Sequence, residues 1–318
     1  MTQISFESAD RDALTQRRRL PLVLQELGVK EPGPSPAGST FYKSLLACPR
    51  EHALSYVVGL ETEHPSQPLT TGTLFHLCLE RYYLALQKFG VGRPGRKVGQ
   101  QRAYEVVDLL ADEPGYGASA EELRALLDAY LTEYDRDEPW EILAVEETVQ
   151  YALGDFRYTT RLDLLVRDLQ RGGVWIVEHK SARYLSADLL DNYQMDLQVL
   201  GQIWLVNEVL DLSKYGPFKG TLINIATKQS PPRLHRHEVL PSPGHLRAFE
   251  ESMRRWVRMR QYAEHESWPQ ALGHCAGYAR GYSRCQFYDL CHGHPEMTVA
   301  DWKDAQPPLG FVQKGTST

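Results

Sequence analysis

Three consecutive segments with the composition of β-strands occupy the middle of this 318-residue chain, between segments with helical spacing. Because only short turns separate them, they are expected to form an antiparallel meander, at residues 144–153, 156–166 and 174–179. Two more strands are expected at 220–226 and 234–239, and helices at 39–58, 71–88, 100–112, 120–134, 187–210 and 245–264. This order of elements predicts an α/β fold of the mixed α+β kind, built around one sheet.

Charged side chains stand at the ends of two of these strands. Asp163 lies near the end of the second strand, and Glu178 and Lys180 follow the apolar run of the third. Because side chains alternate along a strand, Glu178 and Lys180 share one face and His179 takes the other. The intervening turn would bring Asp163 beside Glu178. Two carboxylates and an ammonium that converge in this way could hold Mg²⁺ or Mn²⁺ and serve to cut a phosphodiester.

The same pattern could arise more simply, with Asp163 at the end of a turn while Glu178 and Lys180 form a cross-strand or surface ion pair. Exposed pairs of this kind are common and contribute about 0–1 kcal/mol. The spacing of these three residues does not decide between an ion pair and a metal site, so the rest of the chain has to.

The overall charge gives no sign of nucleic-acid binding. Lys and Arg number 35 against 41 Asp and Glu, a formal net charge of −6, so a nucleic-acid groove would have to be local. Basic clusters lie at 17–19, 228–237 and 254–260, although for any one of them a solvated helix face or tail is the preferred interpretation. No apolar run reaches the length of a membrane span and the N-terminus has no secretory signal, so a cytoplasmic protein without a membrane partner is expected.

Four of the five cysteines form a second constellation. Cys275, Cys285 and Cys291 fall within seventeen residues, and Cys48 lies far upstream. Four thiolates suit tetrahedral zinc or an iron–sulfur cluster, but the spacing matches neither a zinc ribbon nor a ferredoxin, and buried thiols are common in cores. An odd number of cysteines in a reducing compartment argues against disulfides. Cys78, on a predicted helix, is interpreted as a core thiol.

Five motifs occur in a fixed order along the chain. They are the cysteine segment 42–50, the Gly-Thr-x-x-His segment 72–76, the strand segment 160–163, the Glu-x-Lys segment 178–180 and the cysteine tail 275–291. Together they resemble RecB-like nucleases of the PD-(D/E)xK superfamily, in the branch that carries an iron–sulfur cluster. That branch includes the AddB nuclease domain, exonuclease V, CRISPR adaptation nucleases and phage exonucleases. Thr160 and Gln202 depart from the family pattern, which has glycine and tyrosine at these positions.

The resemblance implies a restriction-endonuclease-like core, with a central mixed sheet flanked by helices, over residues 39–300. A flexible N-terminal arm with a Pro-rich linker would precede it at 1–38, and a polar tail would follow at 301–318. The resemblance also implies a four-iron, four-sulfur cluster (4Fe–4S) that staples the N- and C-terminal segments together, with the ligands Cys48, Cys275, Cys285 and Cys291.

The family's site residues map onto single positions of this chain. By resemblance, His76, Asp163 and Glu178 would bind Mg²⁺ or Mn²⁺. Lys180 would orient or deprotonate the attacking water, and Gln198 would hydrogen-bond that water, Lys180 or the substrate backbone. Without the resemblance, His76 would be interpreted as a core histidine and Gln198 as a polar helix position. Weaker candidates are Arg50, Arg161 and Lys228 for phosphate contacts and Glu147 for support of the metal site.

The function expected from this resemblance is metal-dependent hydrolysis of DNA, as an exonuclease on single-stranded ends in recombination, repair or phage DNA metabolism. The chain has no phosphate-binding GxxxxGK(S/T) loop, so any unwinding would need a helicase or recombination partner. The alternative is a DNA-binding or assembly module on a nuclease fold, with cutting weak or lost. The overall acidity and the missing tyrosine leave this alternative open, and metal-stimulated cleavage would distinguish the two.

Overall fold

The computed structural model describes residues 37–62, 71–112, 116–135, 139–153, 156–265, 267–275 and 284–313. They form two compact units. Unit 1 contains the described residues of 67–149 and 161–241, and unit 2 contains those of 34–66, 150–160 and 242–318. The range 39–300, expected from the sequence to be one domain, therefore contributes to both units. The predicted arm and linker at 1–38 lie outside the described residues, except for Ala37 and Gly38.

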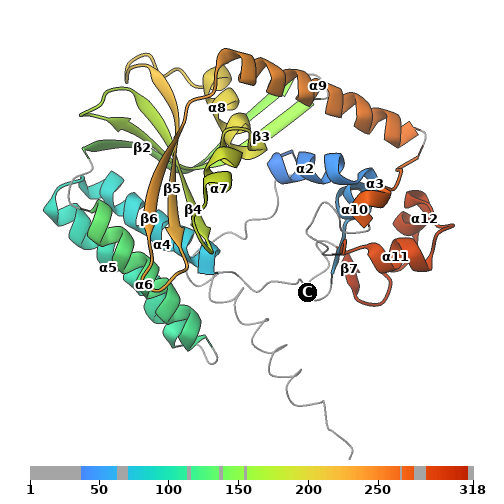
Figure 1. Ribbon diagram of the computed structural model, residues 1–318, viewed down its shortest axis with the longest axis horizontal. Helices are drawn as coiled ribbons and strands as arrows, with labels where there is room; N and C mark the ends of the chain where they lie inside the picture. The colour runs from blue at the N-terminus through green and yellow to red at the C-terminus, as the bar shows by residue number, and fades with distance from the viewer. Residues whose placement is uncertain are drawn as a thin grey trace, which may run out of the picture. The chain divides into compact units, whose positions relative to one another are not determined.

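A five-stranded sheet in the order β2-β3-β4-β5-β6 is the main feature of unit 1 (Figure 1). The strands are β2 Trp140–Leu153, β3 Phe156–Asp168, β4 Val174–Ala182, β5 Phe218–Thr227 and β6 Leu234–Val239. β4 runs antiparallel to β3 and parallel to β5, and β6 is antiparallel to β5. Residues 150–160, at the connected ends of β2 and β3, belong to unit 2. The mixed sheet flanked by helices confirms the predicted fold class.

β4 lies in the interior of the sheet, with neighbours on both sides. The four residues from Val174 to Val177 are apolar and at most 4 % exposed, which is typical of a strand covered on both faces. A parallel neighbour requires a crossover connection rather than a hairpin. That connection from β4 to β5 contains the helices α7 Ala187–Tyr193 and α8 Leu197–Val209.

Three helices cover one face of the sheet in unit 1: α4 Thr71–Phe89, α5 Arg93–Ala111 and α6 Gly117–Tyr134 (Figure 1). α4 contacts β4, and α6 contacts β5 and β6. Their buried positions recur at helical spacing, as Leu123, Leu126 and Tyr130 do on α6, so one stripe of each helix joins the core. Cys78 is fully buried in this core, where the sequence predicts a core thiol.

Two predicted helices are interrupted in the structure. The single helix expected at 187–210 is wrong, because α7 ends at Tyr193 and Asp196 caps the next helix by accepting hydrogen bonds from the N–H groups of Gln198 (2.8 Å) and Val199 (3.2 Å). The helix expected at 39–58 is divided at Cys48, which has φ −160°. A residue that precedes a proline, here Pro49, is pushed out of the helical region by the proline ring.

Unit 2 is built from short elements around one long helix. It contains α2 Ser39–Ala47, α3 Pro49–Ala53, the π-helical turn η1 Leu54–Val58, β1 Leu60–Thr62, α9 Pro243–His265, α10 Leu272–Cys275, α11 Tyr288–Gly293, α12 Val299–Asp304 and β7 Phe311–Gln313. β1 and β7 pair in antiparallel fashion. Leu54, Phe287 and Trp302 belong to one buried cluster.

The C-terminal segment differs from the polar tail predicted from residue 301. Trp302 is 4 % exposed in α12, and residues 311–313 form the strand β7. A capping box between Thr298 and Asp301 begins α12. The described residues up to 313 are therefore part of unit 2. In the part of the chain that the structure describes, no helix has the length and apolar character needed to cross a membrane.

Candidate active site

The turn between β3 and β4 brings the predicted acidic residues onto neighbouring strands. Asp168 Oδ1 accepts hydrogen bonds from the N–H groups of Gln170 (2.9 Å) and Arg171 (2.7 Å), and the next two residues are glycines with positive φ. With this turn the strands pair so that Leu164 lies opposite Val177. Asp163 is then one residue beyond this pair, and its Oδ2 accepts a hydrogen bond from the N–H of His179 at 2.8 Å.

Glu178 is almost fully enclosed, with a side chain that is 1 % exposed. Its Oε1 accepts hydrogen bonds from Lys180 Nζ at 2.5 Å and Gln198 Nε2 at 2.7 Å. Its Oε2 accepts one from Gln202 Nε2 at 2.7 Å. Lys180 Nζ also donates to Gln198 Oε1 at 3.1 Å. A buried carboxylate with three side-chain donors differs from the exposed ion pair that the sequence left open.

His179 points to the other face of β4, as strand alternation predicts. Its ring stacks on Tyr83 with a centroid distance of 5.7 Å and meets Tyr130 edge-on. Burial lowers the pKa of the His179 imidazole to about 3, so it is neutral at physiological pH. His179 therefore belongs to the packing between the sheet and the helices α4 and α6.

His76 reaches Asp163 from α4. The distance from His76 Nδ1 to Asp163 Oδ2 is 3.3 Å. Glu146, on β2, completes a group whose ligand atoms all lie within 4.8 Å of one another. Carboxylate oxygens with one imidazole nitrogen are a donor set that fits Mg²⁺ or Mn²⁺, the second metal accepting the imidazole better.

Glu146 replaces the carboxylate that was expected from the sequence to support the metal site. The prediction was Glu147, but that residue is exposed, whereas Glu146 lies in the group with His76 and Asp163. The backbone at Glu146 has φ +51°, a left-handed conformation that interrupts the regular alternation of the strand. This local irregularity changes which of two adjacent acids faces the site.

Several carboxyl groups lie close together in the buried interior of the site, and this shifts their pKa values. Burial and the neighbouring Asp163 raise the pKa of the Glu146 carboxyl to about 8. The same two causes raise the pKa of Glu178. Burial would also raise the pKa of Asp163, but the charge of His76, the hydrogen bond from His76 and the charge of Lys180 outweigh it, so that pKa lies below its usual value.

For the two basic groups of the site, burial favours the neutral form and the neighbouring carboxylates favour the charged form. Burial opposes the charged form of Lys180, but the carboxylates of Glu178 and Asp163 outweigh it and raise the pKa of the ammonium. Likewise, the Asp163 carboxylate overcomes burial and raises the pKa of the His76 imidazole. Lys180 is therefore a fixed positive charge in this arrangement, better suited to neutralise negative charge than to accept a proton.

Sequence reasoning named Gln202 only as a departure from the family pattern and missed its contact with Glu178. Gln202 is fully buried and lies one helical turn after Gln198 on α8, so the i, i+4 spacing was the available signal. The pair Tyr193-Gln194, about one turn before Gln198, is a candidate in the sequence to compensate for the missing tyrosine, and in the structure Gln194 bonds His237 and the carbonyl of Glu238. Tyr193, by contrast, is close enough to Lys180 for that charge to affect its pKa, which burial raises.

Two of the three candidates for phosphate contacts have partners within the protein. Arg161 forms an ion pair with Glu146, with Nε 2.7 Å from Oε2. In unit 2, Arg50 donates a hydrogen bond to the carbonyl of Met297. The third, Lys228, is half-buried, and its backbone N–H donates a hydrogen bond to the carbonyl of Ala182.

The four cysteines expected to bind a cluster all lie in unit 2. Cys48 Sγ accepts a hydrogen bond from the N–H of Ala271 at 3.5 Å. Burial raises the pKa of the Cys275 thiol, and the nearby thiols of Cys48 and Cys291 raise it further. Four thiols in one unit, three of which interact in this way, are a donor set that fits an iron–sulfur cluster or zinc.

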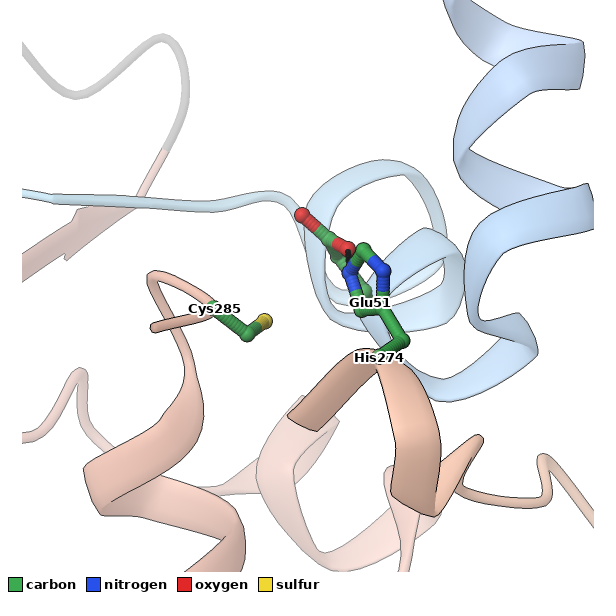
Figure 2. Close-up of side chains that lie close together, drawn as sticks. All are labelled: Glu51, His274 and Cys285. Atoms are coloured by element: carbon green, nitrogen blue, oxygen red, sulfur yellow. Dashed lines mark hydrogen bonds and ion pairs between the residues drawn. The ribbon is translucent and has the colours of Figure 1, made fainter. Parts of the chain in front are cut away.

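The fourth cysteine, Cys285, faces a different pair of residues. His274 Nε2 lies 2.5 Å from Glu51 Oε2, and both side chains are almost fully buried. Figure 2 shows the Cys285 sulfur pointing toward this pair, and the ligand atoms of the three residues lie within 4.8 Å of one another. The sequence had not singled out Glu51 or the histidine beside Cys275.

Comparisons with known proteins identify the family of the chain. The family model of the PD-(D/E)XK nuclease superfamily matches residues 39–292. No curated protein matches the chain. Among solved structures, it is similar to a protein from Eubacterium rectale described as "Putative exonuclease", with 12% identity and a TM-score of 0.45 over 93% of this chain and 100% of that one. It is also similar to the protein SSO0001, with 13% identity and a TM-score of 0.28 over 64% of this chain and 81% of that one. With the family model covering most of its length, the chain belongs to the PD-(D/E)XK nuclease superfamily.

Proposed function

We propose that this protein is a metal-dependent DNA nuclease that hydrolyses phosphodiester bonds as an exonuclease on single-stranded ends. The observation that carries the proposal is the convergence of Asp163, Glu178 and Lys180 at the paired strands β3 and β4, with His76 beside Asp163. Membership of a nuclease superfamily supports DNA as the substrate.

The residues divide into a metal-binding group and a charge-neutralising group. His76, Asp163 and Glu178 would hold Mg²⁺ or Mn²⁺, with Glu146 as a further carboxylate. A bound divalent cation lowers the pKa of water and stabilises charge on a phosphate. Lys180, kept protonated by its two carboxylate neighbours, would stabilise negative charge that develops on the phosphate.

Gln198 would act by positioning. Its side-chain amide bonds Glu178 through Nε2 and Lys180 through Oε1, so one residue of α8 fixes both charged groups of β4 relative to each other. The amide has no net charge, and it can therefore hold the pair without shifting the balance of charge at the site. Gln202 restrains the other oxygen of Glu178 in the same way.

The nuclease proposal can be tested with end-labelled DNA. Wild-type protein is expected to degrade linear single-stranded DNA with Mg²⁺ or Mn²⁺, to leave circular single strands intact, and to be inactive in EDTA. Asp163→Ala and Lys180→Ala should each reduce the rate by about 10²-fold or more, whereas Glu147→Ala, an exposed acid on β2, should not. Full activity in both site variants would refute the proposed site, and cutting of circles would refute the exonuclease assignment.

We further propose that the RecB-like iron–sulfur branch is the right one, with Cys48, Cys275, Cys285 and Cys291 as ligands of a 4Fe–4S cluster. Their gathering in unit 2 supports this, and the raised thiol pKa values of Cys275 and Cys291 mean that the free thiols stay protonated without a cation. Such a cluster would join α3 to the segment around α10 and α11. Protein purified without oxygen should be brown and contain iron and sulfide, whereas a colourless protein with one zinc per chain would contradict the cluster.

A further inference from the structure

Unit 2 has an open groove of about 480 Å³ along α9. One wall is formed by α9, and the rest by residues of α2, α3 and the segment after α9. The lining residues are Leu45, Pro49, Arg255, Arg258, Met259, Tyr262, Ala263 and Pro269. Met259 is 46 % exposed and Tyr262 is 67 % exposed, which are high values for large side chains in a groove.

The α9 residues of the groove form one helical stripe. Arg255, Arg258, Met259 and Tyr262 are spaced i, i+3, i+4 and i+7, so they lie above one another on one face. Phe249, at a different angular position, is buried. The stripe thus combines two cationic side chains with a thioether and a phenol beside a groove whose own surface is largely apolar.

The arginines on α9 differ in whether their charges have partners. Arg254 pairs with Glu250 at 2.7 Å, and Arg260 pairs with Glu264 at 2.9 Å. For Arg255 and Arg258 the structure gives no ion pair or hydrogen bond among the described residues, and both side chains are exposed. Two unpaired cations beside an exposed aromatic ring suit a ligand with both negative charge and flat, stackable groups.

We propose that this groove binds single-stranded DNA, with backbone phosphates on Arg255 and Arg258 and a base stacked on Tyr262. The proposal rests on the proposed nuclease function for the choice of DNA. Single strands are bound by other proteins through the same combination of cationic groups along the backbone and aromatic rings against the bases. Since each of the four bases has a flat face, no sequence preference is expected.

A solvated helix face or a protein-binding groove would account for fewer of these features. A solvated helix face would explain the exposed arginines but not the exposed methionine and tyrosine that line a groove. An apolar segment of another protein would cover those two side chains and leave both guanidinium groups without partners. A single strand uses all four, because its phosphates and bases alternate along the chain.

The test is fluorescence anisotropy of a labelled oligothymidylate with full-length protein in EDTA, where cleavage does not interfere. Arg255→Ala/Arg258→Ala should raise the Kd about tenfold or more, and it should reduce the slope of log K against log salt concentration by about 1.4, since each phosphate contact on a single strand contributes about 0.7. Tyr262→Ala should raise the Kd roughly 5- to 150-fold, and Tyr262→Phe, which keeps the ring, should restore binding.

The charge-matched control is Arg247→Ala/Arg254→Ala, which removes two exposed arginines of α9 that do not line the groove. Its Kd should change much less than that of the groove variant, and its salt slope should remain close to that of the wild type. Equal effects of the two double variants would show that only overall charge matters, and would overturn the proposal. An unchanged Kd in the groove variants would also overturn it, and would leave the groove to a protein segment.

Hydrolysis of thymidine 5′-p-nitrophenyl phosphate separates this proposal from the nuclease proposal, because so small a substrate does not need the groove. The groove variants should hydrolyse it as fast as the wild type while they degrade long single strands more slowly at low DNA concentration. If the wild type cuts nothing, the nuclease proposal fails, and the anisotropy result still decides the groove.

Discussion

Substitution of Gln202 by leucine tests how the buried carboxylate of Glu178 is held. Gln202 Nε2 donates to Oε2 at 2.7 Å, while Oε1 has two other donors, Lys180 and Gln198. Gln202 is fully buried, so no bulk water can replace the lost donor. A hydrogen bond to a charged group contributes about 1.5–3 kcal/mol, and an orphaned buried acceptor costs a similar amount. Gln202→Leu should therefore lower the free energy of unfolding by about 2 kcal/mol.

Gln198→Leu is the matched control, because it removes the same type of donor from the same carboxylate. Glu178 Oε1 would keep Lys180 as a donor at 2.5 Å, and position 198 is only half-buried, so about 1 kcal/mol is expected. Urea unfolding of both variants at pH 8, followed by circular dichroism, measures the difference. Equal losses, or an unchanged stability of Gln202→Leu, would refute the idea that Oε2 depends on Gln202.

Three further outcomes are expected. Glu146→Gln should raise the Mn²⁺ concentration for half-maximal nuclease activity by about 10-fold, whereas Glu147→Gln, exposed on the same strand, should not; a reversed order would contradict the proposed role of Glu146. Burial lowers the pKa of the His52 imidazole from 6.5 to about 4, so between these pH values the unfolded chain binds more protons and stability falls as pH falls. The His52 contribution to the loss between pH 7.5 and pH 5 should be about 2 kcal/mol by urea titration, so the loss should be smaller by that amount in His52→Phe and unchanged in His245→Asn, where the histidine is exposed. Gly220→Ala should cost about 1–3 kcal/mol in thermal unfolding, because φ is +145° and a Cβ would lie 2.4 Å from the carbonyl oxygen of Val239, while Gly117→Ala, in open space, should cost nothing.

The sequence was sufficient where local chemistry determines structure. The turn at 168–173 carries Asp168 and two glycines, the residues that a tight connection requires, and strand alternation then fixed the faces of Glu178 and His179. Periodicity identified α4 and the strands β3 to β6. Pro49 itself indicates a break in the helix before it, but the apolar spacing continues across this position and favours a single helix.

Long-range and irregular features could not be predicted in the same way. β1 and β7 have three residues each and lie roughly 250 positions apart in the sequence. Strands this short carry only a weak local signal, and their pairing depends on a long-range contact that the sequence does not show. The left-handed backbone at Glu146 depends on its surroundings, since glutamate has no intrinsic preference for that conformation. The helix start at Asp196 had a capping signal, but the apolar residues on both sides made one long helix the simpler prediction.

The balance of charge connects the separate features of the candidate site. Three carboxylates, Glu146, Asp163 and Glu178, lie near two fixed cations, Lys180 and Arg161. Burial, and after it the excess of negative charge from Asp163, raises the pKa values of Glu146 and Glu178. A purely structural cluster of this kind would be stabilised by replacing an acid with an apolar side chain of similar size. A site that takes up a divalent cation, in contrast, needs the excess, because the cation supplies the missing positive charge. The arrangement of these acids therefore supports the proposal that the site binds a metal ion.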